Sequence, residues 1–223
     1  MLDTLFSLIA PYECMVCQAQ GAVLCRACTM ATLTYVPSRC FNCLCPTQDF
    51  IQCSTCKSHY YMNSVWVCGV YKGQLKQLIH EYKFAHKRAA VQDLVTLLDA
   101  LLPPIDPQTI ITNVPTASSH IRERGFDHGA LLAKSFARKR GLVYVSCLAR
   151  TGQSRQLGLN RAKRLQNIDG LFHIKSSSLI KGAKFLIIDD VVTTGASINE
   201  AAKVLKHSGA YAVNAATIAQ TVM

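Results

Sequence analysis

Beyond residue 60, the hydrophobic positions follow first a strand period and then a helix period. Residues 61–71 (YMNSVWVCGVY) alternate well enough to predict one or two strands. Gly73 ends this run, and residues 74–84 (QLKQLIHEYKF) place apolar side chains three and four positions apart, which predicts a helix. A second helix is expected over residues 87–102, because Pro103 and the prolines after it end the pattern.

After these prolines, short apolar runs alternate with amphipathic stretches. The amphipathic stretches at residues 128–139 and 197–206 predict helices. The apolar runs predict strands at residues 109–114, 142–149, 171–174, 184–189 and 212–219. Strands that interleave with helices of this length are typical of βαβ units. The sequence therefore predicts an α/β domain with a parallel sheet.

The cysteines divide the chain into two unequal parts. Ten of the eleven cysteines precede Gly69, and only Cys147 follows it. At 223 residues the chain is long enough for one sizeable domain and a small appendage. We therefore expect a small cysteine-rich domain at residues 1–60 and an α/β domain at residues 61–223.

Composition favours a folded protein of the cytosol. Half of the residues are hydrophobic and 17% are charged, which excludes a disordered or fibrous chain. Residues 2–11 are apolar but lack the basic flank of a secretory signal, and no other apolar run approaches the length of a membrane span. We expect a soluble, cytoplasmic protein without membrane insertion. Thiols stay reduced there, and paired cysteines more often hold metal than form disulfides.

Eight cysteines form four pairs, each with two intervening residues. The pairs are Cys14 with Cys17, Cys25 with Cys28, Cys40 with Cys43, and Cys53 with Cys56. Two residues between thiolates let a tight turn aim both sulfurs at one ion, and two such turns complete a tetrahedron. The spacing predicts two zinc ions, which are structural because four thiolates leave no open position. Two pairs that are neighbours in sequence can share one zinc ion with only a short loop between them. A crossed arrangement of the pairs, or Cys45 as a ligand in place of Cys43, is also possible. Cys68 and Cys147 lie in apolar runs and are expected in the core.

The net charge of the whole chain is +11, and residues 61–223 carry all of the excess, because residues 1–60 hold three basic and three acidic side chains. A basic body indicates anionic partners, which are either phosphorylated small molecules or nucleic acid. The basic side chains of residues 72–88, Lys83 among them, are interpreted singly as a solvated helix face. His128, which has no partner evident in the sequence, is interpreted as structural or solvated.

The segment with the most specific chemistry is residues 185–197 (FLIIDDVVTTGAS). Four apolar residues predict a buried parallel strand, Asp189 and Asp190 follow at its carboxyl end, and a loop of small residues opens into a helix near Ser197. Loop amides, hydroxyls and the helix N-terminus can bind a phosphate. The two carboxylates would then accept hydrogen bonds from sugar hydroxyls and help to hold a magnesium ion. The competing interpretation is a strand that ends in a solvated acidic turn.

This segment resembles the phosphoribosyl pyrophosphate (PRPP) motif of type I phosphoribosyltransferases. Residues 78–84 (LIHEYKF), 122–128 (RERGFDH) and 156–172 (QLGLNRAKRLQNIDGLF) further resemble successive signatures of the ComF family of competence proteins. The resemblance covers nearly the whole chain and implies a zinc-binding head before a phosphoribosyltransferase domain. The chain departs from the family pattern at Ala117, where the family usually has histidine, and at Asp127 and His128, where it has Asn-Gln.

The resemblance implies three sets of site residues. The PRPP and phosphate site would consist of Asp189, Asp190, Val191, Val192, Thr193, Thr194, Gly195, Ala196 and Ser197, with Val114, Pro115, Thr116, Arg122 and Arg124 near the pyrophosphate. A flap at residues 150–167 would offer Arg155, Arg161, Lys163 and Arg164 to nucleic acid. The metal ligands would be the eight paired cysteines. Catalytic residues are not identified.

Three functions from different classes remain at this stage. The resemblance favours a competence protein that binds PRPP with magnesium and single-stranded DNA, and that acts with other DNA-uptake proteins during natural transformation. The alternative is a metabolic phosphoribosyltransferase, for which no acceptor site is evident, and whether the chain is an enzyme stays open. The third is an interaction module with a zinc-binding head and a vestigial PRPP site. The intact acidic pair and the intact loop of small residues argue against this third function.

Overall fold

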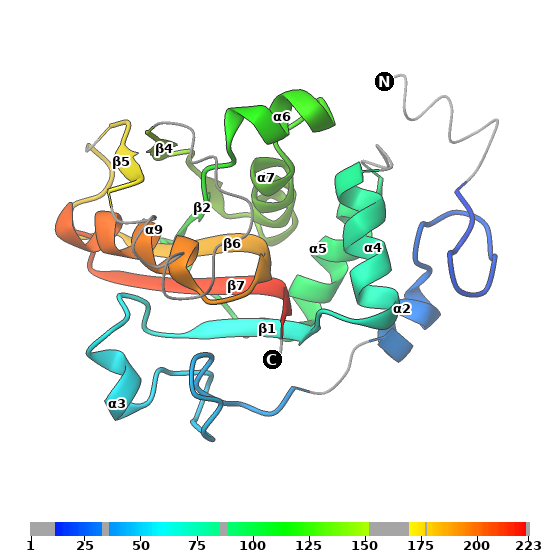
Figure 1. Cartoon of the computed structure of the whole chain (residues 1–223), viewed down its shortest axis with the longest axis horizontal. Coiled ribbons are helices and arrows are strands. Elements are labelled where there is room, and N and C mark those ends of the chain that lie inside the picture. Colours follow the sequence, from blue (N-terminus) through cyan, green and yellow to red (C-terminus); the bar gives the residue numbers. More distant parts are fainter. Residues whose placement is uncertain (1–11, 33–35, 85–88, 152–169, 177, 222–223) are drawn as a thin grey trace.

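The computed structural model describes residues 12–32, 36–84, 89–151, 170–176 and 178–221, and its centre is a five-stranded parallel sheet of order β1-β7-β6-β2-β3 (Figure 1). The strands are β1 (Val65–Val70), β2 (Ile110–Asn113), β3 (Val143–Tyr144), β6 (Lys184–Val192) and β7 (Ala212–Gln220). A separate antiparallel pair consists of β4 (Leu148–Arg150) and β5 (Phe172–Ile174). The predicted α/β fold with a parallel sheet is confirmed.

Helices cover both faces of this sheet. Its helices are α4 (Gly73–Phe84), α5 (Ala90–Leu101), α6 (Ser118–Arg124), α7 (His128–Arg140) and α9 (Ala196–His207). Helices α4, α5 and α7 share one core cluster with the sheet, and α9 packs in a second cluster on the other face. Two differences from the sequence prediction concern loops. The run at 142–149 divides into β3 and β4, and α6 forms in a segment for which the sequence predicted no helix.

The side-chain alternation of β6 separates the two faces. Leu186 and Ile188 lie in the cluster of α4, α5 and α7, whereas Phe185 and Ile187 lie in the cluster of α9. Strand β6 does not end at Asp189, as the sequence suggested, but continues through the acidic pair to Val192. Because successive side chains of a strand point to opposite faces, Asp189 and Asp190 are directed to different sides of the sheet.

The cysteine-rich region packs against the sheet domain in two separate places. Its first half, with α2 (Arg26–Thr32), adds Leu24 to the cluster of α5. Its second half, with α3 (Ser54–Lys57), adds Phe41 to the cluster of α9. Figure 1 shows α2 beside α4 and α3 toward the other end of β1. The two halves thus use opposite faces of one sheet.

Two further expectations concern buried thiols and membranes. Cys68 and Cys147 are both buried in the core, as the sequence predicted. Within the described ranges, no helix combines the length and the apolar character that a membrane span requires.

Candidate functional site

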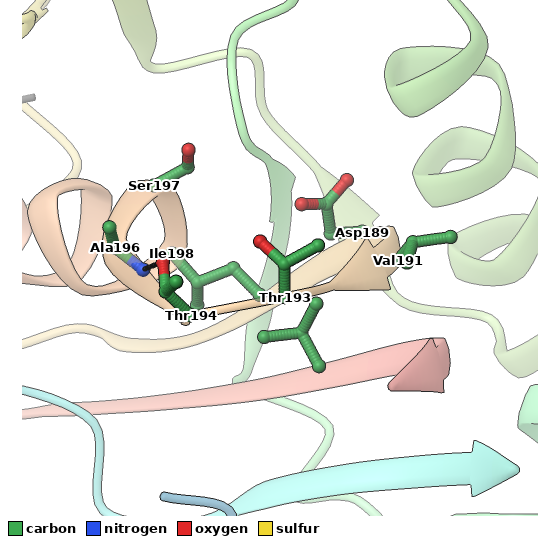
Figure 2. A pocket seen from close by; sticks show the side chains of 9 residues that line it. Asp189, Val191, Thr193, Thr194, Ala196, Ser197 and Ile198 are labelled. Atoms are coloured by element: carbon green, nitrogen blue, oxygen red, sulfur yellow. Dashed lines mark hydrogen bonds between the residues drawn. The ribbon is translucent and has the colours of Figure 1, made fainter. Parts of the chain in front are cut away.

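A pocket lies at the carboxyl end of β6, where the chain turns into α9 (Figure 2). Its volume is about 230 Å³. The residues that line it are Asp189, Val191, Val192, Thr193, Thr194, Gly195, Ala196, Ser197 and Ile198. All of the loop residues predicted to bind phosphate are therefore brought together in one place. In Figure 2 the side-chain oxygens of Asp189, Thr193 and Ser197 point to the same side.

The position of this pocket follows from the strand order. The chain leaves β2 toward β3 and leaves β6 toward β7, so the connections diverge between the neighbouring strands β2 and β6. The carboxyl ends of parallel strands at such a point form a crevice in which α/β proteins bind ligands. Gly195, with φ +75°, is the N-cap of α9 and directs the first free amides of that helix toward the pocket. The pocket can therefore accept an anion such as a phosphate.

Asp189 is the carboxylate of the acidic pair that faces the pocket. Its side chain is partly buried, and one carboxylate oxygen accepts the Asp190 amide over 2.9 Å. Burial, followed by the nearby charge of Asp190, raises the pKa of Asp189 to about 7. A carboxylate kept where its ionised form is disfavoured is typical of a site that meets a cation or a ligand. A carboxylate oxygen is a ligand that Mg²⁺ prefers, so Asp189 fits the magnesium ion that the sequence predicts at this site.

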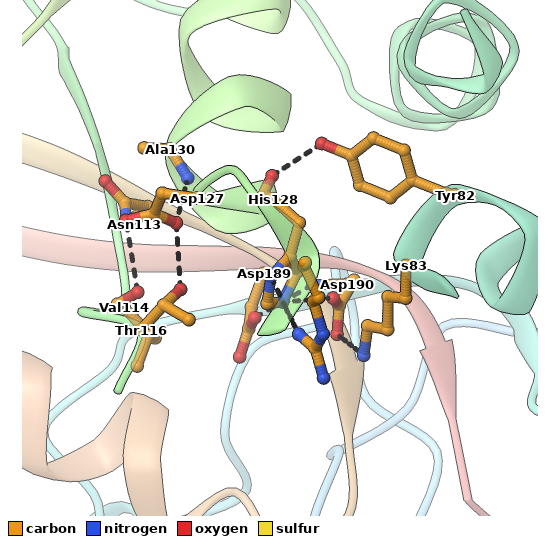
Figure 3. Close-up of polar contacts among 11 residues, drawn as sticks. Tyr82, Lys83, Asn113, Val114, Thr116, Asp127, His128, Ala130, Asp189 and Asp190 are labelled. Carbon is orange, nitrogen blue, oxygen red and sulfur yellow. Dashed lines mark hydrogen bonds and ion pairs between the residues drawn. The ribbon is translucent and has the colours of Figure 1, made fainter. Parts of the chain in front are cut away.

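Asp190 lies instead in a buried charge cluster on the other side of β6 (Figure 3). Lys83 of α4 donates from Nζ to Asp190 Oδ1 over 2.8 Å, and His128 Nε2 of α7 lies 3.0 Å from Oδ2. Burial opposes ionisation, but hydrogen bonding from His128 and the charge of Lys83 hold the pKa of Asp190 at about 2. Asp190 therefore fixes α4 and α7 to β6.

Arg124 joins this cluster through His128. It is buried, its Nη1 lies 2.9 Å from His128 Nδ1, and its guanidinium lies over the ring of Phe84 at 4.9 Å. The same Arg124 Nη1 lies 3.3 Å from His128 Nε2, so the guanidinium contacts both nitrogens of the imidazole. Arg122, the other arginine expected near the pyrophosphate, is exposed on α6.

The loop after β2 is held by a second polar network. Thr116 donates to Asp127 Oδ1 over 2.8 Å, and the same oxygen accepts the amide of Ala130 over 3.0 Å, which caps α7. Asn113 donates to the carbonyl of Val114 over 3.0 Å. The loop from Val114 through Pro115 to Thr116 thus begins at the carboxyl end of β2, the strand beside β6.

Lys83 and His128 are members of the site that the sequence did not predict. Both lie in segments that resemble family signatures, at residues 78–84 and 122–128, but helices distant along the chain bring them to Asp190, so the local sequence does not identify Asp190 as their partner. The alternation of β6 did offer one signal, because Asp190 has the same parity as the buried Ile188. The flap residues Arg155, Arg161, Lys163 and Arg164 lie outside the described residues.

The paired cysteines converge into two tetrads. The first tetrad is Cys14, Cys17, Cys25 and Cys28, and the second tetrad is Cys40, Cys43, Cys53 and Cys56. Within each tetrad the sulfur atoms all lie within 4.8 Å of one another. Cys17 and Cys25 have sulfurs 3.6 Å apart, and Cys43 and Cys53 have sulfurs 3.5 Å apart. Two thiolates at about 2.3 Å from a tetrahedral ion would be separated by about 3.8 Å, so both tetrads fit zinc.

This arrangement joins neighbouring pairs rather than crossed ones. Cys45 is not a member of the second tetrad. Each tetrad is built within one continuous segment of the chain, so the two sites are independent in sequence as well as in space.

Comparison with known proteins agrees with this architecture. Residues 129–221 match the family model of the phosphoribosyl transferase domain. The chain is 28% identical over 231 residues to the DNA utilization protein YhgH of Escherichia coli K12, a match that covers 96% of this chain and 99% of that protein. It is 25% identical to Competence protein F of Haemophilus influenzae, covering 79% of this chain and 76% of that protein. It is 27% identical to Competence protein ComFC of Streptococcus pneumoniae, covering 63% of this chain and 60% of that protein.

Proposed function

Because this chain is a ComF-family protein with the type I phosphoribosyltransferase fold, we propose that it binds PRPP with Mg²⁺ and single-stranded DNA during DNA uptake. The names of its relatives, competence proteins and DNA utilization proteins, support a role in DNA uptake. Such a role would be carried out in the cytoplasm with other uptake proteins.

The observation that carries the PRPP proposal is the pocket at the β6–α9 junction. The N-terminal amides of α9 and the hydroxyls of Thr193, Thr194 and Ser197 would bind the ribose 5-phosphate. Asp189, directed into the same pocket, would accept a sugar hydroxyl or coordinate Mg²⁺, the ion that would neutralise phosphate charge. Asp190 would act indirectly, because its side chain is engaged by Lys83 and His128.

The proposal includes two structural zinc ions. Each tetrad has the ligand type, the ligand number and the spacing of a closed zinc site. Metal analysis of the purified protein should give about two zinc ions per chain, since each tetrad fills one tetrahedron. A folded protein that contains no zinc would refute this part of the proposal.

Magnesium-dependent PRPP binding can be tested by calorimetry on single variants of the acidic pair. Asp189→Asn should weaken PRPP binding by roughly tenfold or more, because the pocket loses the charge that meets the cation. Asp190→Asn should mainly destabilise the fold, by about 3 kcal/mol, because it leaves Lys83 without its buried partner. Asp106→Asn is the matched control, since Asp106 is only partly buried and pairs with Lys184 at the amino end of β6, away from the pocket.

Equal PRPP affinity in Asp189→Asn and the parent would mean that the pocket has been misassigned. The same samples can be assayed for pyrophosphate release with and without single-stranded DNA. Release that depends on DNA would make the protein an enzyme that acts on nucleic acid. Release that depends on a small-molecule acceptor would favour the alternative of a metabolic phosphoribosyltransferase.

Single-stranded DNA binding is proposed from the charge of the chain. The net charge of +11 lies in residues 61–223, and counterion release from phosphates is the main source of affinity for such a surface. Flap arginines Arg155, Arg161 and Arg164, together with Lys163, are the proposed contacts. Affinity should fall with salt, with a log–log slope of about −0.7 per phosphate contacted.

Two triple variants test the proposed DNA contacts. Replacing Arg155, Arg161 and Arg164 by glutamine should flatten the salt slope by about two units if each meets one phosphate. The matched control replaces Lys134, Arg138 and Lys139, three exposed basic residues of α7. Anisotropy titrations at several salt concentrations measure both. The assignment to the flap is wrong if the two triple variants change the slope equally.

A further inference from the structure

The second tetrad and the phosphate pocket are in direct contact through Phe41 and Gly195. A Cβ atom added to Gly195 would lie 2.4 Å from Phe41 Cε2 and 2.6 Å from Phe41 Cζ, so the ring rests on the glycine backbone. Phe41 is buried in the same cluster as Val192 and Ile198, which both line the pocket. The aromatic ring therefore forms the support beneath the loop that opens α9.

Phe41 belongs to the turn between Cys40 and Cys43, and polar contacts connect it to the sulfur ligands. Asn42 donates from Nδ2 to Cys56 Sγ over 3.3 Å, and its Oδ1 accepts the Tyr60 hydroxyl over 2.6 Å. The Tyr60 ring meets the edge of Phe41, with centroids 5.1 Å apart. Bonds of this kind to a coordinating sulfur orient the ligand and the turn that carries it. The position of the Phe41 ring is thus tied to the geometry of the second tetrad.

The segment after the second tetrad is also joined to α9. The amide of Tyr61 donates to Asn199 Oδ1 over 2.8 Å, and Asn199 Nδ2 donates to the carbonyl of His59 over 3.3 Å. On the other side, Gln220 at the end of β7 donates to the Phe41 carbonyl over 2.7 Å. Both the first turn of α9 and the end of β7 are therefore braced by residues 41–61.

Apart from these contacts and the second tetrad, the second half of the cysteine region has little regular structure that would fix residues 41–61 in place. Leu44, Asp49 and Phe50 have positive φ angles, and no regular strand runs through the described residues 36–60, where only isolated bridges form. A small segment of this kind depends on its metal for a fixed conformation. Loss of the ion would release the turn that carries Phe41.

We propose that Phe41 is a positioning residue for the phosphate pocket, and that metal binding at the second tetrad, but not at the first, sets the affinity of that pocket for phosphoribosyl ligands. This inference rests on the proposed PRPP function. The first tetrad differs because its buried neighbours, Val23 and Leu24, pack in the cluster of α5 on the opposite face of the sheet.

Two matched double variants test the inference. Cys43→Ser with Cys53→Ser removes one exposed and one partly exposed thiol of the second tetrad, and Cys17→Ser with Cys25→Ser does the same in the first. Zinc content should fall from about two to about one ion per chain in both variants. Calorimetry with PRPP and Mg²⁺ should show affinity weakened by roughly tenfold in the second-tetrad variant, but within about twofold of the parent in the first-tetrad variant.

Phe41→Leu is a third variant that keeps every sulfur ligand. It should retain both zinc ions and still weaken PRPP binding by about tenfold, because the aliphatic side chain no longer supports Gly195. This result would separate positioning of the loop from general unfolding. Retained affinity in Phe41→Leu, or equal losses in the two double variants, would overturn the inference.

Amide hydrogen exchange distinguishes failure of this inference from failure of the proposed function. Exchange at residues 193–199 should accelerate in the Phe41→Leu and second-tetrad variants and stay at the parental rate in the first-tetrad variant. If the parent itself does not bind PRPP, the proposed ligand is wrong, and the exchange rates still decide whether the second tetrad controls the loop. Unchanged exchange in the second-tetrad variant would refute the coupling.

Discussion

The first and second tetrads are nearly identical as metal sites and different in what they support. Each has two Cys-x-x-Cys pairs, and in each the four sulfurs lie within 4.8 Å of one another. The first tetrad carries Leu24, directly before Cys25, which packs with α5, whereas the second carries Phe41, which packs against the start of α9. The same metal-binding motif therefore stabilises the hydrophobic core on one face and a ligand pocket on the other.

This difference teaches that the role of a structural metal site depends on the face of the sheet it covers. In β6 the alternation of side chains sends Leu186 and Ile188 to one cluster and Phe185 and Ile187 to the other. The second cluster includes Val192 and Ile198, which line the pocket, whereas the first cluster meets the pocket lining at the partly buried Val191. We therefore expect a site on the face of the second cluster to influence ligand binding more strongly than a site on the opposite face.

The largest expected effect concerns the first tetrad. Leu24→Ala should lower the free energy of unfolding by about 4 kcal/mol, because Leu24 is 1% exposed and its loss leaves a cavity against α5. Affinity for PRPP at a temperature where the variant is folded should change less than twofold. Denaturant unfolding and calorimetry measure the two quantities.

The control for Leu24→Ala is Met30→Ala, an exposed position of α2 that should change stability by less than about 0.5 kcal/mol. The comparison between the tetrads would break if Leu24→Ala weakened PRPP binding as much as Phe41→Leu does. In that case both halves of the cysteine region would act on the pocket.

The next effect concerns the contact between Phe41 and Gly195. Gly195→Ala should cost about 3 kcal/mol, because the new Cβ adds a clash with Phe41 to the cost of a positive φ in a residue other than glycine. Gly182→Ala is a matched control with the same φ of +75° and no atom within 4 Å of the added Cβ, so it should cost only about 1 kcal/mol.

A double-mutant cycle sharpens this second prediction. In a Phe41→Ala background the cost of Gly195→Ala should fall by about 2 kcal/mol, since the clash is gone and only the backbone cost remains. Urea unfolding of the four proteins gives the interaction energy. An energy near zero would show that Phe41 does not rest on Gly195 in solution.

How far the sequence predicted this molecule depends on how local each feature is. Hydrophobic periodicity gave the strands and helices to within a few residues, and the spacing of the cysteines gave both tetrads, because these signals lie within short segments. The Lys83 contact to Asp190 joins residues 107 positions apart, and the Gln220 contact to Phe41 joins residues 179 positions apart. Such contacts are fixed only when the helices pack on the sheet.

The acidic pair illustrates the same limit. The sequence treated Asp189 and Asp190 as two equivalent ligands, because adjacent carboxylates after an apolar run have no local feature that separates them. In the structure the strand continues through both, so that one faces the pocket and the other faces Lys83 and His128. Knowing where a strand ends was the missing information.

The smallest expected effect is the pH dependence of the junction between the first tetrad and α5. Asp93, in the first turn of α5, accepts the Leu24 amide over 3.0 Å, and burial raises the pKa of Asp93 to about 6 although the Leu24 and Val23 amides oppose the shift. Because the folded-state pKa is above the usual value, the protonated form favours folding. The contribution of protonated Asp93 to the free energy of unfolding is complete below about pH 4 and is lost as the pH rises through about 6.

Asp93→Asn keeps an oxygen that can accept the Leu24 amide and removes the titration. The variant should match the parent in stability near pH 4 and exceed it by about 1 kcal/mol at pH 7.5, a figure reduced from the full pKa shift because Asp93 is partly exposed to screening solvent. Thermal unfolding across this pH range measures the difference.

Asp106→Asn is the control of opposite sign, since Lys184 lowers the pKa of Asp106 and the variant should lose stability at neutral pH. PRPP affinity should stay parental in Asp93→Asn at both pH values, because Asp93 acts on the face of the sheet that does not carry the pocket. A variant less stable than the parent at pH 7.5 would mean that the amide bonds, and not burial, dominate at Asp93, and a change in its PRPP affinity would remove the distinction between the two faces.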